Sequence, residues 1–411
     1  MKIAIYNWSE LDTHEQQRLL ERPAVTGDDA IRATTADIIA RVRDGGDATV
    51  RKLTQRFDGA EIVDLRVTED EISAATKTLQ PAQLAAIDLA IDNVRRFHEP
   101  QRPGPIQVET MPGVVCERIS QPLDAVGLYV PAGTAPLPSA AIMLAVPAVI
   151  AGCPKRVLCT PPRADGTADE AVMVAASRAG VSEIFKIGGA QAIAAMAYGT
   201  ESVPKVSKVF GPGNAWVTSA KALVSSDPHG AAMDLPAGPS EVLVIADESA
   251  SAEFVAADLL SQAEHGVDSQ VVLVTTSRQL AADVNRAVEM QLANLSRAEI
   301  AGAALVNSRI LLVEDLPTAV DVSNLYAPEH LILQVTSPRE LLSTLRNAGS
   351  VFVGPWTPES VGDYCSGTNH VLPTYGYARN YSGLGVDQFM RQMTIQELSR
   401  RGLEGLGDAV I

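Results

Sequence analysis

The chain has 411 residues, of which 46% are hydrophobic and 20% are charged, and its formal net charge is −16. This length predicts two or three domains with cores of normal size, so that folding needs neither a disulfide nor a metal. The negative charge argues against nucleic-acid backbones and anionic membranes as main partners, but it does not exclude a nucleotide cofactor held by local groups.

The four cysteines, Cys116, Cys153, Cys159 and Cys365, contain no C-x-x-C pair and do not resemble a disulfide framework. Nothing in the sequence around them lowers a thiol pKa, so we interpret them as core or bystander residues. The N-terminus lacks the basic and apolar regions of a signal peptide, and the longest apolar stretch, 140–153, is too short to span a bilayer. We therefore expect a reducing, cytoplasmic setting and no membrane partner.

Residues 1–120 are predicted to form a mainly helical N-terminal region. Helices are expected over 28–43, 47–57 and 81–99, with Gly45-Gly46 ending the first of them. His14 and His98 are isolated and are expected to face the solvent. This region contains no constellation of residues that suggests chemistry.

From Leu123 onward, strand, loop and helix recur four times, and this alternation predicts a parallel sheet with helices on both faces. A break rich in Gly, Pro and Ala at 229–239 marks a boundary, after which the alternation restarts. We predict an α/β fold with two Rossmann-like domains over 121–237 and 238–372, the first on the NAD side and the second with the zinc and acid/base residues discussed below. A C-terminal tail over 373–411 is expected to be loop-like and then helical from 394 to 410.

Two glycine turns in the first α/β domain each follow a strand and open a helix. They are Gly188-Gly189-Ala190-Gln191 and Gly211-Pro212-Gly213-Asn214, and Tyr129 ends another strand of the same domain. Backbone N–H groups and the positive helix end at such turns can hold a phosphate. The third glycine of the dinucleotide fingerprint is missing because position 216 is Trp, so ordinary α/β turns remain the alternative.

The helix expected over 251–265 ends in an amide and an imidazole. Val255, Leu259 and Gln262 recur at helical spacing, and His265 lies three residues further on the same side. Gly266 is placed as a C-cap, and the exposed carbonyls of a helix end attract a cation. The alternative is a histidine that only caps the helix.

Two further segments carry titratable side chains. Glu329 and His330 stand after a proline and before a strand, where a neutral His can take a proton and a Glu can activate water or orient the His. The segment 361–370 is expected to be a loop in which Asp363 and His370 are suitable zinc ligands. The alternatives are an exposed acid beside a half-buried histidine, and a plain turn.

Six segments in collinear order together resemble the histidinol dehydrogenase family. They are Tyr129-Val-Pro-Ala-Gly, Phe210-Gly-Pro-Gly-Asn-Ala, Asp234-Leu-Pro-Ala-Gly-Pro-Ser240-Glu-Val, Ser261-Gln-Ala-Glu-His-Gly, Leu325-Tyr-Ala-Pro-Glu-His-Leu and Gly362-Asp-Tyr-x-Ser-Gly-Thr-Asn-His-Val-Leu-Pro-Thr. The similarity covers essentially the whole chain.

The resemblance implies a zinc-containing, NAD-dependent homodimer of two Rossmann-like domains. Such an enzyme oxidises L-histidinol to L-histidine through a bound aldehyde, in two hydride transfers that end histidine biosynthesis. Carried over by position, the resemblance implies zinc ligands at Gln262, His265 and Asp363, an acid/base pair at Glu329 and His330, further substrate contacts at Ser240 and His370, and NAD contacts at Tyr129, Gln191 and Asn214. The zinc ligands and the acid/base pair are implied to contact substrate as well.

One departure from the family concerns the C-terminus. The family has a further segment with an acidic substrate contact and a histidine that ligates the zinc of the partner subunit. No histidine follows His370 here, and we expect that segment to lie beyond Ile411. Three alternatives stay open at this point: a dehydrogenase of another polar alcohol, a zinc hydrolase with His265, Asp363 and His370 on the metal and Glu329 as base, and a non-catalytic binding protein.

Overall fold

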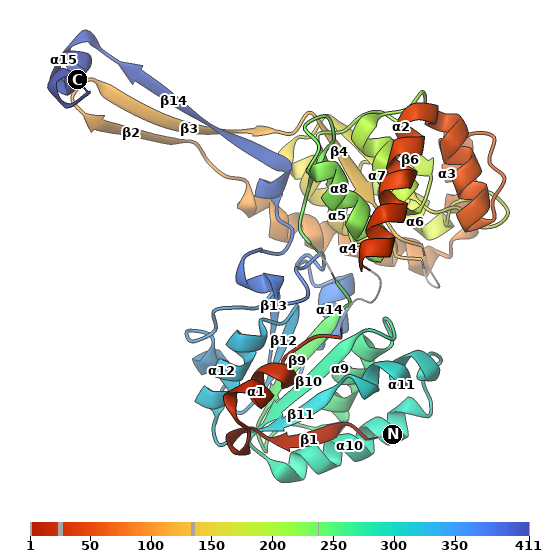
Figure 1. Cartoon of the computed structure of the whole chain (residues 1–411), viewed down its shortest axis with the longest axis vertical. Helices are drawn as coiled ribbons and strands as arrows, with labels where there is room; N and C mark the ends of the chain where they lie inside the picture. Colours follow the sequence, from red (N-terminus) through yellow and green to blue (C-terminus); the bar gives the residue numbers. More distant parts are fainter. Residues whose placement is uncertain (1, 24–27, 133–135, 237, 411) are drawn as a thin grey trace. The chain divides into compact units, whose positions relative to one another are not determined.

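The computed structural model describes residues 2–23, 28–132, 136–236 and 238–410. The chain forms two compact units. Unit 1 comprises residues 1–41, 211–226 and 235–384, and unit 2 comprises residues 42–210, 227–234 and 385–411. Each unit combines a parallel sheet with helices, which confirms the predicted α/β class (Figure 1).

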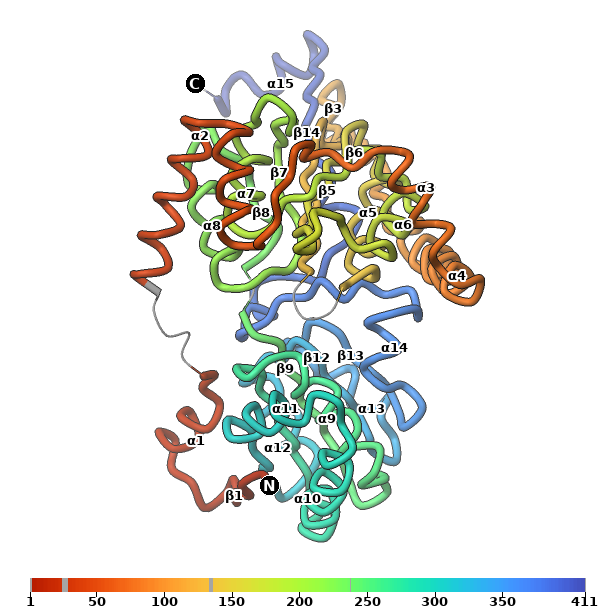
Figure 2. The backbone as a smooth tube through the Cα atoms, turned by 90° about the vertical axis from the view of Figure 1, so that its right-hand side faces the viewer, coloured from red at the N-terminus to blue at the C-terminus, as the bar shows by residue number. Residues whose placement is uncertain are grey.

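Unit 1 contains a six-stranded, all-parallel sheet in the order β1-β11-β10-β9-β12-β13, and Figure 2 shows β9, β12 and β13 side by side. The strands are β1 (Ala4–Asn7), β9 (Glu241–Ala246), β10 (Gln270–Thr275), β11 (Arg309–Leu312), β12 (His330–Gln334) and β13 (Ser350–Val353). The helices are η1 (Trp8–Glu10), α1 (Thr13–Leu19), α8 (Ala215–Ser225), α9 (Ala252–Ala263), α10 (Arg278–Leu292), α11 (Ala298–Val306), α12 (Leu316–Tyr326), α13 (Pro338–Leu341), α14 (Glu359–Tyr364) and η3 (Tyr377–Arg379).

The central strand β9 separates two hydrophobic cores. Val242 and Val244 belong to the core that includes residues of α9, α10 and α11, whereas Leu243 and Ile245 belong to the core that includes residues of α12. Successive strand residues point to opposite faces of a sheet. A continuous apolar run such as that of β9 is therefore what a sheet covered by helices on both faces requires.

Unit 2 contains a parallel sheet in the order β6-β5-β4-β7-β8 and an antiparallel sheet in the order β14-β3-β2. The strands are β2 (Ile106–Met111), β3 (Val114–Pro122), β4 (Ala125–Tyr129), β5 (Lys155–Thr160), β6 (Glu183–Lys186), β7 (Lys208–Phe210), β8 (Ala232–Met233) and β14 (Met390–Leu398). The helices are α3 (Glu69–Thr78), α4 (Pro81–His98), η2 (Glu99–Gln101), α5 (Pro138–Ala151), α6 (Glu170–Arg178), α7 (Gly189–Tyr198), η4 (Val386–Phe389) and α15 (Arg400–Val410). We call β2, β3 and β14 the ribbon.

The helices expected over 28–43 and 47–57 form one element, α2 (Asp28–Asp58), interrupted at Gly46. Gly46 has φ 51° and ψ −143°, a conformation that glycine adopts without steric penalty. The break lies where the glycine pair predicted it.

Two parts of the expected secondary structure are wrong or incomplete. Residues 394–398 were expected to be helical, but they belong to β14, which pairs antiparallel with β3 over its whole length. The N-terminal region includes three strands that were not expected, namely β1, β2 and β3. Strand β1 is only four residues long and pairs with β11, which lies about 300 positions away in the sequence (Figure 1). Pairing partners so distant leave no local signal.

The expected exposure of His98 is wrong, whereas His14 is exposed as expected. His98 is fully buried, and its Nδ1 donates to the carbonyl of Val94 at 2.8 Å. His98 lies four residues after Val94 and therefore extends the buried face of α4 by one turn. None of the helices in the described ranges is long and apolar enough to cross a membrane.

Candidate active site

Glu329 and His330 lie at the edge of the unit 1 sheet because the preceding helix ends abruptly just before them. Helix α12 stops at Tyr326, and Ala327 adopts a left-handed conformation with φ 55°. Pro328 disfavours a helical conformation at the residue before it. His330 then begins β12, so both titratable side chains enter the sheet edge, where both are buried.

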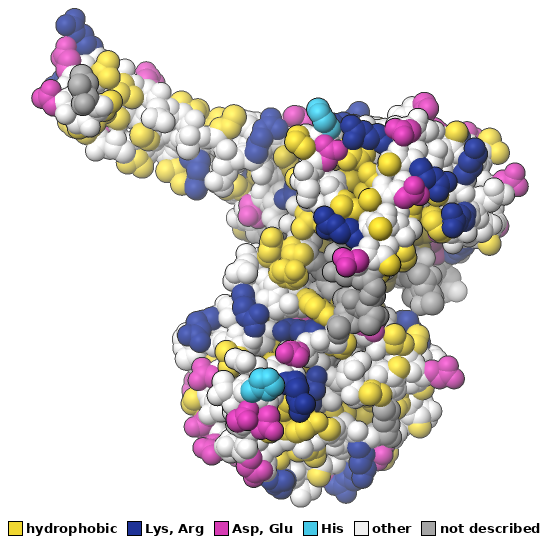
Figure 3. All heavy atoms as spheres, in the orientation of Figure 1, with side chains coloured by type: hydrophobic (Ala, Val, Ile, Leu, Met, Phe, Trp, Pro, Cys, Tyr) yellow, Lys and Arg dark blue, Asp and Glu magenta, His cyan; other side chains and the backbone are white. Residues whose placement is uncertain are grey.

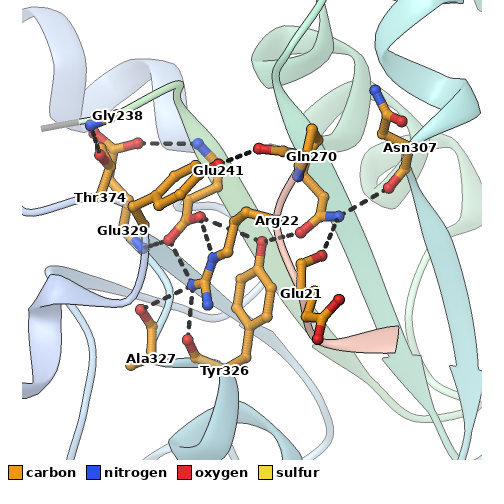
Figure 4. Close-up of polar contacts among 12 residues, drawn as sticks. Glu21, Arg22, Gly238, Glu241, Gln270, Asn307, Tyr326, Ala327, Glu329 and Thr374 are labelled. Carbon is orange, nitrogen blue, oxygen red and sulfur yellow. Dashed lines mark hydrogen bonds and ion pairs between the residues drawn. The ribbon is translucent and has the colours of Figure 1, made fainter. Parts of the chain in front are cut away.

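Polar residues begin three neighbouring strands of this sheet. Glu241 begins β9, Gln270 begins β10 and His330 begins β12, and the three strands are adjacent and parallel. Parallel strands place their amino ends at one edge of the sheet. Gln270 pairs with Glu241 in register, so these two buried side chains share one face of the sheet (Figure 4). His330 pairs with Val242, so its buried side chain lies on the opposite face and meets Glu241 only at the backbone.

Glu241 holds the Glu329–His330 pair through its backbone. Its N–H donates to Oε2 of Glu329 at 3.0 Å, and its carbonyl accepts from Nδ1 of His330 at 3.2 Å. The N–H of Glu329 donates in return to Oε1 of Glu241 at 3.3 Å. A carbonyl can only accept, so Nδ1 of His330 carries a proton and Nε2 is the nitrogen left to face a ligand.

A cluster of metal-type donors adjoins this pair. One donor atom each from His265, Glu359 and Asp363 lie within 4.8 Å of one another. His265 Nε2 is 4.0 Å from Asp363 Oδ2, and His330 Nε2 is 3.7 Å from Asp363 Oδ1. Gln262 Nε2 lies 3.3 Å from His265 Nδ1. The structure thus places His265 and Asp363, two of the three expected zinc ligands, in one cluster beside His330, and it places the third, Gln262, next to His265.

The local structure around these donors differs from the expectation in two respects. Asp363 lies on the short helix α14 and not in a loop. Helix α9 ends at Ala263 with Glu264 as its C-cap, so Gly266 is not the capping residue. His265 therefore stands in the turn after the helix, where its Nδ1 donates to the carbonyl of Ser261 at 2.9 Å and leaves Nε2 free to bind a cation.

Sequence reasoning missed Glu359. It stands four residues before Asp363, which is the spacing that places two side chains on one face of a helix. Its Oε2 accepts from the hydroxyl of Ser261 at 2.9 Å. Because the segment around Asp363 was expected to be a loop, the helical spacing between Glu359 and Asp363 was not recognised.

Burial and like charges shift the pKa values of the cluster. Burial raises the pKa of Glu329 to about 8, and burial together with the neighbouring Asp363 carboxylate raises that of Glu359 to about 8. The pKa of His330 rises to about 10, because the surrounding Glu329, Asp363 and Glu359 outweigh the opposing effect of burial. Burial opposes ionisation of Asp363 as well, but the proximity of His330, whose Nε2 is 3.7 Å from Oδ1, and the charge of His370 hold the pKa of Asp363 well below its usual range.

Four buried polar atoms of this region have no hydrogen-bond partner among the described residues. They are Gln262 Oε1, His330 Nε2, Glu359 Oε1 and His370 Nε2. An unpaired buried polar atom is costly, so an accumulation of them indicates a site that binds a ligand. Oxygen and nitrogen donors of this kind fit Zn²⁺.

The two other expected substrate contacts are half-buried in unit 1. Ser240 immediately precedes β9, and its carbonyl accepts from the N–H of Gln270 at 3.3 Å. Burial lowers the pKa of His370, which favours the neutral ring.

The expected cofactor residues lie at the turns that follow strands. Tyr129 ends β4, and its hydroxyl accepts from the N–H of Gly189 at 3.0 Å. Gln191 is buried in the first turn of α7, and its Oε1 is the atom nearest to the position that a Cβ on Gly189 would occupy. Asn214 caps α8, accepting from the N–H groups of Trp216 and Val217.

Comparisons with known proteins decide the family. The family model described as histidinol dehydrogenase matches residues 21–411. The chain is 56% identical over 404 residues to the histidinol dehydrogenase of Vibrio vulnificus (strain YJ016), which covers 98% of this chain and 93% of that protein. The chain belongs to the histidinol dehydrogenase family. The resemblance to this family that the six sequence segments indicated is confirmed.

Other members of the histidinol dehydrogenase family agree over the same range. The histidinol dehydrogenase of Yersinia pestis is 52% identical over 99% of this chain and 91% of its own length. The crystal structure of histidinol dehydrogenase from Elizabethkingia anophelis matches with a TM-score of 0.95 and 42% identity, covering 99% of this chain and 93% of that one. Members of the histidinol dehydrogenase family are oxidoreductases, and so is this chain.

The cysteines of this histidinol dehydrogenase family member are not bridged to one another. Burial raises the pKa of Cys153 to about 11 and that of Cys159 still higher. Thiols of such high pKa are poor nucleophiles. This agrees with the interpretation of Cys153 and Cys159 as core residues.

Proposed function

We propose that this chain oxidises L-histidinol to L-histidine, the last steps of histidine biosynthesis, with two molecules of NAD as hydride acceptors. The observation that carries the proposal is the buried Glu329–His330 pair beside the cluster of His265, Glu359 and Asp363, with Gln262 next to His265. A base beside metal donors is what a polar alcohol needs for oxidation, and the exposed His265 leaves the cluster open to a ligand. The four free cysteines favour a cytoplasmic setting.

In this proposal, His330 is the proton acceptor for the alcohol. The hydrogen bond from Nδ1 to the Glu241 carbonyl fixes the ring and directs Nε2 toward Asp363. Loss of a hydride from the primary alcohol must be accompanied by loss of its hydroxyl proton, and Nε2 of the uncharged ring is placed to take it. The raised pKa of His330 makes that uncharged ring a strong base. Each oxidation step thus releases one hydride and one proton.

Glu329 serves the second step. The aldehyde must add water before a second hydride can leave, and a carboxylate can take the proton of that water. Burial raises the pKa of Glu329 to about 8, so its carboxylate is a stronger base than an exposed one. His330 lies 3.6 Å away, measured from Nδ1 to Oε2, and its positive form stabilises the carboxylate.

We propose that Gln262 Oε1, His265 Nε2 and Asp363 hold a zinc ion. The buried Oε1 of Gln262 has no other partner in the described chain, and the Nδ1 hydrogen bond of His265 presents Nε2 as a ligand. When bound, zinc would hold the amine and imidazole of histidinol in place. Ser240 and His370 are proposed to contact the same substrate.

For the cofactor, we propose Tyr129, Gln191 and Asn214 as NAD contacts. The Tyr129 hydroxyl accepts a hydrogen bond from Gly189 and keeps its own proton to donate. Gly189 has φ 60° and Gly211 has φ 124°, so both turns depend on glycine at these positions. NAD when bound accepts the hydride.

We further propose that the chain works as a homodimer whose partner completes the site. The ribbon and α15 expose apolar side chains, and Figure 3 shows hydrophobic side chains along this part of unit 2. They include Ile106, Val108, Met393, Ile395 and Leu403. Such a patch on a soluble chain marks an interaction surface. Sedimentation equilibrium should give twice the mass of one chain.

The proposed activity is tested by following NADH formation with L-histidinol. The expected result is NADH formation that stops when a chelator removes the metal and returns when zinc is added. A hydrolase would release product without NAD, and a binding protein would do neither. Absence of NADH formation by the zinc-loaded protein would contradict the proposal.

A further inference from the structure

The N-terminal segment, which showed no sign of chemistry in the sequence, places a buried cation against Glu241, the residue that holds the Glu329–His330 pair. The Arg22 side chain is 9% exposed, and the Glu241 side chain, which it contacts, is 1% exposed. Nε and one terminal nitrogen of Arg22 donate to the two carboxylate oxygens of Glu241 at 2.8 and 2.9 Å. This two-point contact is the geometry in which a guanidinium fixes a carboxylate best (Figure 4).

Arg22 is itself held in place by Tyr326 and by hydrogen bonds to the backbone of its two neighbours in the chain. Its guanidinium lies 3.7 Å from the ring centre of Tyr326 and donates to the Tyr326 carbonyl at 2.7 Å. Gln270 Nε2 donates to the carbonyl of Glu21 at 3.2 Å, and the hydroxyl of Tyr375 donates to the carbonyl of Pro23. Backbone groups on both sides of Arg22 are therefore fixed.

The contacts continue from Arg22 to the catalytic pair through one residue. The Glu241 carboxylate that Arg22 binds also accepts the N–H of Glu329, and the Glu241 backbone binds both the Glu329 carboxylate and the His330 ring. Loss of the Arg22 charge would leave a buried, unpaired carboxylate at the start of β9. That carboxylate could be relieved only by taking a proton or by moving toward solvent.

We propose that Arg22 is a positioning residue for the Glu329–His330 pair and acts on it through Glu241. This inference rests on the proposed function, because it assigns Arg22 a role in the reaction of that pair. Arg22 fixes the Glu241 backbone, whose carbonyl sets the tautomer of His330 and whose N–H orients the Glu329 carboxylate. Binding of the metal and of NAD does not depend on it.

The test compares Arg22→Ala and Arg22→Lys with the unsubstituted protein, using Arg309→Ala as the matched control. Arg309 is partly buried and donates at 3.4 Å to the carbonyl of Glu21, the residue before Arg22. Its hydrogen bonds do not include Glu241. We expect Arg22→Ala to lower kcat for L-histidinol by about 10- to 100-fold, the range typical of residues that orient a catalytic shell. KM, zinc content and NAD affinity measured by calorimetry should stay within about threefold. The Arg309 variant should retain kcat.

A rescue experiment separates positioning from mere stability. Guanidinium ion added at low concentration should restore part of the kcat of Arg22→Ala, because it can reoccupy the space beside Glu241, and it should leave the control unchanged. Arg22→Lys keeps the charge but cannot make the two-point contact, so an intermediate kcat is expected. If Arg22→Ala does not fold, Arg22→Lys carries the same comparison.

The outcomes distinguish this inference from the proposed function. If the unsubstituted protein forms no NADH from L-histidinol, the proposed function has failed. If it is active and a folded, zinc-loaded Arg22 variant keeps full kcat, the inference is overturned and the function stands. Loss of kcat only in proportion to unfolded protein or lost zinc would overturn it too.

Discussion

Gly349 lies where any side chain would displace the backbone of Glu329. A Cβ on Gly349 would stand 2.6 Å from the carbonyl oxygen of Glu329 and 3.3 Å from its carbonyl carbon. The same glycine donates its N–H to the carbonyl of Pro328 at 2.9 Å, and Ser350 donates to that of Glu329 at 2.9 Å. These hydrogen bonds prevent the two segments from separating freely.

The perturbation is Gly349→Ala, and its size follows from the geometry. Cβ contacts shorter than 3.0 Å are essentially never found, so the backbone at Glu329 must move by at least 0.4 Å, the difference between 3.0 and 2.6 Å. Overpacking of this kind costs about 1–3 kcal/mol of unfolding free energy. A misplacement of about 1 Å can cost a catalytic site about 100-fold in rate, so a shift of this size should lower kcat about tenfold.

The assay is kcat for NADH formation from L-histidinol, together with the free energy of unfolding in urea. The matched control is Gly302→Ala, because the position of a Cβ on Gly302 has no atom within 4 Å and the residue lies within helix α11. Alanine there should stabilise the helix by up to about 1 kcal/mol and leave kcat unchanged. A Gly349→Ala protein with the kcat and stability of the unsubstituted protein would refute the reasoning.

Three further predictions concern the metal, the cofactor and pH. Gln262→Ala should lower zinc affinity or raise KM for L-histidinol, because the buried Oε1 of Gln262 is proposed as a ligand; unchanged zinc content by metal analysis together with an unchanged KM would count against that role. Tyr129→Phe should weaken NAD binding measured by calorimetry, because it removes the hydroxyl that holds the Gly189 N–H; an unaltered Kd would exclude this contact. Burial raises the pKa of Asp258 to about 6. The folded protein therefore holds this proton more tightly than the unfolded chain, and ionisation of Asp258 lowers stability as pH rises from about 4 to 6, by about 3 kcal/mol for two pKa units. Asp258→Asn should lose this dependence. The free energy of unfolding of the variant minus that of the unsubstituted protein should therefore rise between pH 4 and 6 and stay constant above pH 6. A difference that does not change with pH would argue against a raised pKa of Asp258.

The α/β part of the fold was predictable because its signal is local. Apolar runs such as that of β9, separated by glycine turns and helical patterns, predict strands and helices without knowledge of their partners. The strand β1 and the C-terminal half of β14 were missed because their stability comes from pairing with β11 and β3, which are distant in the sequence. Strands β2 and β3 were missed too, and their residues are exposed or half-buried except at Val114. His98 was misjudged because its burial depends on what packs against α4.

The candidate site was only partly predictable for the same reason. Gln262 and His265, or Glu329 and His330, could be found as neighbours in sequence, whereas their meeting at Asp363 requires the fold. Glu359 could have been found from its spacing of four to Asp363 if the segment had been read as a helix. Arg22 could not, because its partner Glu241 is 219 residues away in the chain.

A signal for the sheet edge was nevertheless present in the sequence. Strands β9, β10 and β12 are apolar runs that each begin with a polar residue, namely Glu241, Gln270 and His330. Parallel strands align their amino ends, so polar residues at the starts of adjacent strands are brought to one edge of the sheet. Only the order of the strands is needed in addition to the sequence to bring these three residues to one edge.

The most direct test of the account is the stoichiometry of the reaction. A limiting, known amount of L-histidinol is converted to completion by the zinc-loaded protein with excess NAD, and both NADH and L-histidine are quantified. The account predicts two NADH for each L-histidine formed, because Glu329 and His330 serve two successive oxidations in one site. One NADH per substrate, with the aldehyde released as product, would contradict it.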